Sequence, residues 1–146
     1  MDFAKLMDSI SSHEGTGPVV GGRYMPYTDT TGHLSIGRGI NLAVGLSPAD
    51  ESFLFNNRLQ IATGSAESQD WWQYVAGNDA RANALVECVF NLGIDGVAEF
   101  HVALAAMAAG DWSACGAAFL DSLWARQIGK RAEVLANMII SGEFPT

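Results

Sequence analysis

Residues 12–42 read SHEGTGPVVGGRYMPYTDTTGHLSIGRGINL, and this stretch decides the architecture of the N-terminal part of the chain. Two carboxylates, Glu14 and Asp29, bracket a segment rich in glycine and proline. The segment HLSIGRGINL then alternates apolar and polar residues and is interrupted by two glycines. Alternation of this kind between turn residues is typical of short antiparallel strands. We therefore expect a small antiparallel sheet with loops over residues 15–46.

Helical patterns surround this stretch on both sides. Residues 2–11 place four apolar side chains at i, i+3, i+4 and i+7, which form one face of a short amphipathic helix: Phe3, Leu6, Met7 and Ile10. A second helix is expected to begin at Ser47 as N-cap, with Pro48 in the first helical position, and to fade over residues 63–69.

The rest of the chain is predicted to be helical from residue 70 onward. Glycines divide this part into segments with helical periodicity, over residues 78–93, 97–110, 111–124 and 129–142, with Gly142 as the final C-cap. The expected fold class is α+β. A small N-terminal lobe, about residues 12–60, holds a short antiparallel sheet, and a mostly helical lobe holds about residues 70–146.

Length and charge exclude several classes of function. The 146 residues suffice for one domain with a substantial core. A net charge of -8 argues against nucleic acid as a partner, because phosphate binding needs a basic surface. No apolar run is long enough for a membrane span, and the charged N-terminal segment does not resemble a secretory signal. We expect a monomer without a membrane anchor.

The cysteines and histidines predict neither a metal site nor a cofactor. Cys88 and Cys115 lie in apolar helical segments, where a free cysteine behaves as a small hydrophobic residue, with a mutual disulfide as the alternative. The three histidines, His13, His33 and His101, are scattered and are interpreted as surface or loop residues.

The acid pair suggests glycoside hydrolysis, which typically uses two carboxylates on either side of the scissile bond. Glu14 is expected at the end of a helix, where partial burial raises the pKa of a carboxyl group and suits a general acid. Asp29 lies in the polar turn YTDTTG, where hydroxyls and backbone N–H groups keep a carboxylate ionised. From spacing alone, a helix-end charge and a turn former are the preferred explanation of the two acids, because structural acids are common in such places.

Three motifs in collinear order resemble the phage-type lysozymes, glycoside hydrolase family 24. HEG followed by YTDTTGHLSIGRG is similar to the catalytic signature of that family. ALVECVFNLGIDGVAEF (84–100) resembles its central buried helix, and SLWARQIGKRAEVLANMIISGEF (122–144) resembles its closing segment. The resemblance implies a lysozyme-like fold with a cleft between the lobes and residues 2–11 packed on the helical lobe.

The resemblance also assigns roles to individual residues. Glu14 corresponds to the general acid, and Asp29 to the carboxylate that holds the attacking water. Ser35 falls where the family usually has threonine, and its hydroxyl is expected to position that water. The residues expected to contact substrate are Asn41, Phe90, Asn91 and Arg131.

Further expectations concern Arg131, Phe90, Trp124 and the spacer between the two acids. Arg131 falls where the family has an arginine that pairs with the catalytic glutamate. Phe90 and Trp124 are also expected to serve as core residues. The spacer between the two acids is longer than in compact family members, and we expect it to form an extra hairpin.

The implied function is that of an endolysin muramidase. Such an enzyme cleaves the β-1,4 bond between N-acetylmuramic acid and N-acetylglucosamine in peptidoglycan, with inversion of configuration. It accumulates in the host cytoplasm and then acts on the cell wall. The alternatives are a lytic transglycosylase on a similar fold, a non-catalytic wall-binding virion protein, and a helical interaction protein in which the motifs are coincidental.

Overall fold

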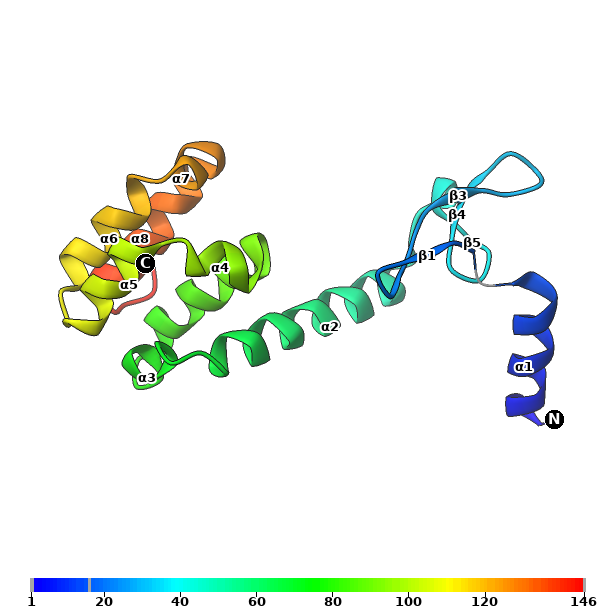
Figure 1. Cartoon of the computed structure of the whole chain (residues 1–146), viewed down its shortest axis with the longest axis horizontal. Helices are drawn as coiled ribbons and strands as arrows, with labels where there is room; N and C mark the ends of the chain where they lie inside the picture. Colours follow the sequence, from blue (N-terminus) through cyan, green and yellow to red (C-terminus); the bar gives the residue numbers. More distant parts are fainter. Residues whose placement is uncertain (1, 16, 146) are drawn as a thin grey trace. The chain divides into compact units, whose positions relative to one another are not determined.

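The computed structural model describes residues 2–15 and 17–145, which divide into two compact units, Met1–Phe53 and Leu54–Thr146 (Figure 1). The first unit contains the N-terminal helix, a short 3-10 helix, the start of a long helix and all the strands of the described residues, and the second unit is helical. The predicted α+β fold class is therefore confirmed. The arrangement of the two lobes around a cleft stays a prediction.

The N-terminal helix α1 spans Phe3–Glu14, so it contains the predicted apolar face and ends at Glu14 as expected. The Asp2 side chain caps it by accepting a hydrogen bond of 3.2 Å from the backbone N–H of Lys5. Gly15, at φ 70°, ends it immediately after Glu14. The apolar face of α1 is exposed, and its packing on the helical lobe stays a prediction.

Five short strands form two antiparallel sheets, as the alternating sequence predicted. The strands are β1 (Val19–Val20), β2 (Arg23–Tyr24), β3 (Tyr27–Thr28), β4 (Leu34–Ile36) and β5 (Ile40–Asn41). Strands β1 and β2 form the extra hairpin expected in the long spacer between the acids. Strands β3, β4 and β5 form a three-stranded sheet in that order.

The register of the three-stranded sheet places Ser35 at its centre. Ser35 on β4 lies opposite Tyr27 on β3 and opposite Asn41 on β5. Gly17, outside this sheet, leaves room for Tyr27, because a Cβ at that position would lie 2.6 Å from the tyrosine ring. These contacts fix Ser35 in the interior of the sheet.

Helix α2 begins and ends as predicted. It spans Pro48–Glu67, and Ser47 caps it by accepting a hydrogen bond of 3.2 Å from the backbone N–H of Asp50. The helix continues through Gly64 and ends at Glu67, within the expected range 63–69. Ala62 and Ala66 are buried in the hydrophobic core, and this packing outweighs the weak local propensity.

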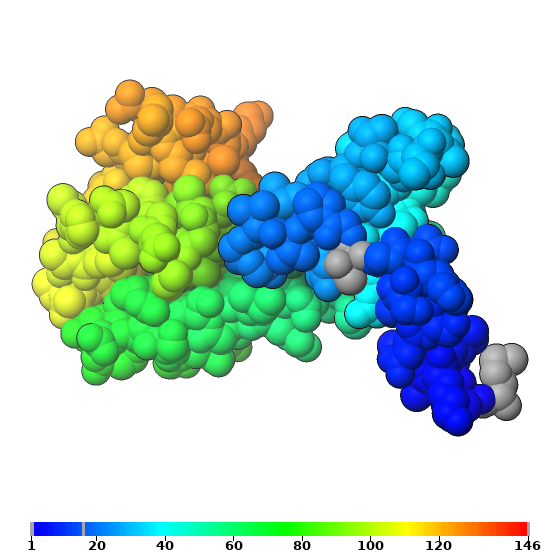
Figure 2. Space-filling view, turned by 45° about the vertical axis from the view of Figure 1, so that its right-hand side comes forward, coloured from blue at the N-terminus to red at the C-terminus, as the bar shows by residue number. Residues whose placement is uncertain are grey.

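Six further helices form the C-terminal unit, which Figure 2 shows in green to orange as closely packed surfaces. They are α3 (Trp72–Val75), α4 (Asp79–Ala98), α5 (His101–Ala108), α6 (Trp112–Leu120), α7 (Leu123–Ile128) and α8 (Lys130–Ser141). Gly116 lets α6 approach α8 closely, since a Cβ there would overlap Ile140 Cγ1. Gly142 ends α8 in the left-handed conformation, as predicted.

Two breaks in the helical unit differ in how well the sequence predicts them. Gly93, at φ 76° and ψ 167°, interrupts α4 as expected, whereas Gly96 stays within the helix. The break at Glu99–Phe100 between α4 and α5 was not predicted, and the expectation of one helix over 97–110 is wrong. The expectation of one helix over 111–124 is wrong as well, because Asp121 and Ser122 separate α6 from α7. The Phe100 ring packs 4.7 Å from that of Phe119, so tertiary contacts accompany the break.

The two cysteines are buried free thiols in the helical core. Burial raises the pKa of Cys88 to about 12 and that of Cys115 to about 11, so both stay protonated at neutral pH. Among the described residues no single helix has the length and apolar content to cross a bilayer. Helices α4 and α5 meet those limits only as a pair bent by 95°.

Candidate functional site

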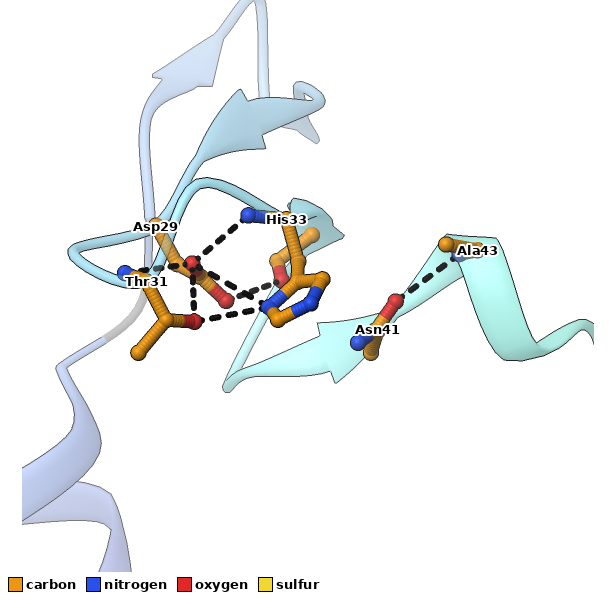
Figure 3. Close-up of polar contacts among 6 residues, drawn as sticks. Asp29, Thr31, His33, Asn41 and Ala43 are labelled. Carbon is orange, nitrogen blue, oxygen red and sulfur yellow. Dashed lines mark hydrogen bonds and ion pairs between the residues drawn. The ribbon is translucent and has the colours of Figure 1, made fainter.

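Asp29 is the most heavily hydrogen-bonded carboxylate in the N-terminal unit (Figure 3). It lies in the turn between β3 and β4. Its Oδ1 accepts hydrogen bonds from Thr31 N at 2.9 Å, Thr31 Oγ1 at 2.7 Å and His33 N at 2.9 Å. The turn is closed by a backbone bond of 2.9 Å from Asp29 N to the carbonyl of His33. The polar turn therefore wraps around one carboxylate oxygen.

These contacts keep Asp29 ionised. The Thr31 hydroxyl, followed by the backbone N–H of His33, lowers the pKa of Asp29 from 3.8 to about 2, while partial desolvation opposes the shift. The sequence predicted an ionised carboxylate in this turn from its hydroxyls and backbone N–H groups. The residues that provide them, Thr31 and His33, were not singled out.

Ser35 contacts the second oxygen of the same carboxylate. Its hydroxyl donates a hydrogen bond of 3.1 Å to Asp29 Oδ2. The Ser35 side chain is 1% exposed, so its rotamer is restricted by the surrounding sheet. Asp29 and Ser35, which the sequence predicted to hold and position the attacking water, are thus in direct contact.

Glu14 lies at the C-terminal end of α1, where the helix places it beside the backbone of Gly39. Its Oε2 lies 3.3 Å from the position that a Cβ on Gly39 would occupy. Gly39 has φ 74°, so both its conformation and this close approach favour glycine. The Glu14 side chain is exposed, however, and the partial burial that we expected for it is not present.

Asn41 is used locally in the structure. Its Oδ1 accepts a hydrogen bond of 2.8 Å from the backbone N–H of Ala43 and so caps the short helix η1 (Leu42–Val44) (Figure 3). Its position opposite Ser35 places it on the neighbouring strand of the candidate site. Substrate contact by Asn41 stays a prediction.

The other predicted substrate residues lie in the C-terminal unit. Arg131 Nε donates a hydrogen bond of 2.6 Å to Glu87 Oε1, so the structure gives this arginine a partner that the sequence did not predict. Asn91 Oδ1 accepts a bond of 2.8 Å from the indole N–H of Trp124. Trp124 is buried, which confirms its expected role in the core.

Phe90 combines a core position with a pocket. It packs against the buried core, and its ring lies 5.7 Å from that of Phe55. Within the C-terminal unit it lines an open cavity of about 420 Å³, whose other lining residues are Phe55, Leu59, Asn83, Val86, Glu87 and Arg131. The lining is mostly apolar and includes the Glu87–Arg131 ion pair.

The site residues therefore fall into two groups. Glu14, Asp29, Ser35 and Asn41 belong to the N-terminal unit, whereas Phe90, Asn91 and Arg131 belong to the C-terminal unit. In the part of the chain that the structure describes, no three His, Cys, Asp or Glu residues are grouped so that they could hold a metal ion. The chemistry available at Asp29 is that of an ionised carboxylate next to a hydroxyl.

Comparisons with known proteins place the sequence in a family. The family model described as phage lysozyme matches residues 18–138. The matched region includes Asp29, Ser35 and Arg131 but begins after Glu14. The chain is also 42% identical over 71 residues to the pre-baseplate central spike protein Gp5 of Enterobacteria phage T4. That similarity covers 49% of this chain and 12% of the spike protein.

Proposed function

The chain belongs to the phage lysozyme family, and we propose that it is a muramidase that hydrolyses the β-1,4 bonds between N-acetylmuramic acid and N-acetylglucosamine in peptidoglycan. The observation that carries this proposal is the Asp29 carboxylate. It is held ionised by three donors on Oδ1, and its Oδ2 lies beside the buried Ser35 hydroxyl. An ionised carboxylate paired with a hydroxyl is suited to bind and activate a water.

Asp29 and Ser35 would have different roles toward the attacking water. A water bound to Asp29 Oδ2 would lose its proton to that carboxylate while the Ser35 hydroxyl fixes its direction of attack. The low pKa of Asp29 favours electrostatic stabilisation of the positively charged sugar in the transition state over strong basicity. An oxocarbenium-like sugar needs little help from a strong base.

Glu14 would donate the proton to the leaving oxygen. Its side chain is exposed in the free protein. We therefore propose that the bound glycan excludes water from Glu14 and so keeps its carboxyl group protonated. Arg131 is paired with Glu87, and we propose that it binds the glycan from the C-terminal unit together with Phe90 and Asn91.

A second candidate function is supported by the spike relative. The T4 protein is named as a central spike protein of the pre-baseplate, and this chain spans 12% of its length. We propose as the alternative that this lysozyme domain acts within a virion, on the wall at the start of infection. A lytic transglycosylase remains the chemical alternative, in which the glycan's own hydroxyl replaces water.

The test is peptidoglycan lysis by the wild type and by Glu14→Gln and Asp29→Asn variants, followed by mass spectrometry of the released muropeptides. Asp8→Asn, which removes another exposed acid from α1, is the control for Glu14. Loss of general acid catalysis typically costs about a hundredfold or more. Near-normal lysis by folded Glu14→Gln would contradict the role of Glu14. The release of 1,6-anhydro products would show that the reaction is transglycosylation and not hydrolysis.

The stereochemistry of the product tests the role of Asp29. If Asp29 holds a water, the new reducing end first appears as the α-anomer, because water attacks from the face opposite the leaving group. NMR of the first product, recorded before mutarotation, distinguishes the outcomes. A β-anomer would make Asp29 a nucleophile and would contradict the proposed inversion.

A further inference from the structure

We infer that His33, acting through Thr31, is a positioning residue that fixes which oxygen of Asp29 faces the reaction. The contacts form a chain: His33 Nδ1 lies 2.7 Å from Thr31 Oγ1, which lies 2.7 Å from Asp29 Oδ1 (Figure 3). The catalytic consequence rests on the proposed function. The hydrogen-bond assignment itself does not depend on that function.

Counting protons determines the direction of each bond in this chain. A threonine hydroxyl has a single proton, and an ionised carboxylate only accepts. The Thr31 proton must therefore point to Asp29 Oδ1, because two oxygens at 2.7 Å without a proton between them would repel each other. Thr31 Oγ1 is then the acceptor for His33, so the imidazole must have its proton on Nδ1. Neutral His33 is thus held in the Nδ1–H tautomer.

This chain of hydrogen bonds from His33 through Thr31 to Asp29, called the relay below, distinguishes the two oxygens of the carboxylate. Oδ1 accepts hydrogen bonds from Thr31 N, Thr31 Oγ1 and His33 N. These three donors leave no room for a further hydrogen bond to Oδ1. Within the described residues, Oδ2 accepts from Ser35 Oγ alone. Rotation of the carboxylate would break several bonds on Oδ1, so the arrangement keeps Oδ2 directed to Ser35. The water of the proposed reaction would therefore bind at Oδ2.

His33 contributes at both ends of the turn. Its backbone N–H donates to Asp29 Oδ1, and its backbone carbonyl accepts from Asp29 N. Any residue except proline can supply these backbone bonds at position 33. The side chain adds the bond to Thr31 and places Nδ1 3.9 Å from Asp29 Oδ1, so substitutions of His33 at a pH where the imidazole is neutral separate the relay from the turn that contains it.

The first test measures the imidazole directly. Long-range ¹H–¹⁵N NMR of ¹⁵N-labelled wild-type protein, at a pH where His33 is neutral, reports which ring nitrogen has the proton. We expect the Nδ1–H tautomer at His33, and loss of that preference in Thr31→Val. Thr31→Ser keeps the hydroxyl and should retain the preference. A neutral His33 with its proton on Nε2 would overturn the inference.

The second test follows the Asp29 carboxyl by ¹³C NMR during an acid titration. Thr31→Val should raise the pKa of Asp29 from about 2 toward 3.8, because the Thr31 hydroxyl is the largest cause of the low value, and Thr31→Ser should keep it low. His33→Asn places an amide N–H near the position of Nδ1 and so can replace the bond to Thr31. Thr30→Val, in the same turn, is the control. An unchanged Asp29 pKa in Thr31→Val would overturn the inference.

Rates on soluble peptidoglycan fragments separate this inference from the proposed function. His33→Leu should lower kcat several-fold with little change in KM, and His33→Asn should recover most of the loss. An inactive wild type that retains the Nδ1–H tautomer would contradict the muramidase proposal and leave the relay standing. An active wild type whose kcat is equal in all His33 variants would overturn the positioning role.

Discussion

Ser35 Oγ donates a hydrogen bond of 3.1 Å to Asp29 Oδ2 from a side chain that is 1% exposed. Asp29 lies in the turn that follows β3, and Ser35 lies on β4, the strand that follows the same turn. A buried hydroxyl with one fixed acceptor has few alternative rotamers. The pair is therefore preorganised before any substrate is bound.

Removal of the Ser35 hydroxyl should lower activity more than stability. Ser35→Ala takes away a hydrogen bond to a charged group, and we expect a loss of roughly tenfold or more in the rate of peptidoglycan hydrolysis. Ser35→Thr keeps the hydroxyl, and its added methyl group restricts the rotamer, so activity should be kept or raised. Rates are measured alongside thermal unfolding, and wild-type activity in Ser35→Ala would make Ser35 a structural residue only.

The low pKa of Asp29 predicts a specific acid sensitivity of the fold. Because the pKa is about 2 in the folded chain and 3.8 ordinarily, the ionised carboxylate stabilises the fold fully above pH 3.8. This contribution should be lost as the pH falls from 3.8 to about 2. Thermal unfolding of wild type and Asp29→Asn across this range should show a steeper decline for the wild type. Parallel stability curves for the two proteins would indicate that folding does not lower the pKa of Asp29.

Gly39 should be required for the position of Glu14 as well as for its own conformation. Gly37 and Gly39 both have positive φ, so alanine at either site should cost about 1–2 kcal/mol in unfolding free energy. Only at Gly39 would the new Cβ contact Glu14, at 3.3 Å from Oε2. We therefore expect a larger loss of hydrolysis in Gly39→Ala than in Gly37→Ala. Equal losses of hydrolysis in the two variants would show that the contact between position 39 and Glu14 does not matter for activity.

The contact between α6 and α8 should not tolerate a methyl group. In Gly116→Ala the new Cβ would overlap Ile140 Cγ1 and approach the carbonyl of Ala136 to 3.1 Å. Overpacking of this kind costs about 1–3 kcal/mol. Gly64→Ala is the matched control, because Gly64 lies within α2 with open space around it and should gain stability by up to about 1 kcal/mol. Denaturant unfolding measures both.

A second substitution tests whether the overlap at Gly116 is the cause. Ile140→Ala removes the atoms that would clash, so its cost and that of Gly116→Ala should be less than additive in the double variant. Additive costs would show that the strain lies in the backbone of α6 instead of at Ile140.

The sequence by itself determined the elements that depend on local chemistry. Helix caps at Ser47 and Gly142, the alternation around Ser35, and the hydroxyl-rich turn at Asp29 each act within a few residues, so their patterns are visible along the chain. The chemical type of the candidate site followed from the same residues. Its ionised acid and neighbouring hydroxyl were predicted and are in contact in the structure.

Only the tertiary structure decided which partners these residues have. Glu87 pairs with Arg131 across 44 positions, and no local pattern indicates that choice. The break at Phe100 occurs where there is no glycine or proline, beside its packing on Phe119. The relay from His33 depends on the turn that brings its imidazole to the Thr31 hydroxyl. Contacts of this kind form when the backbone brings distant or turn-related atoms together, and residue order alone does not specify that geometry.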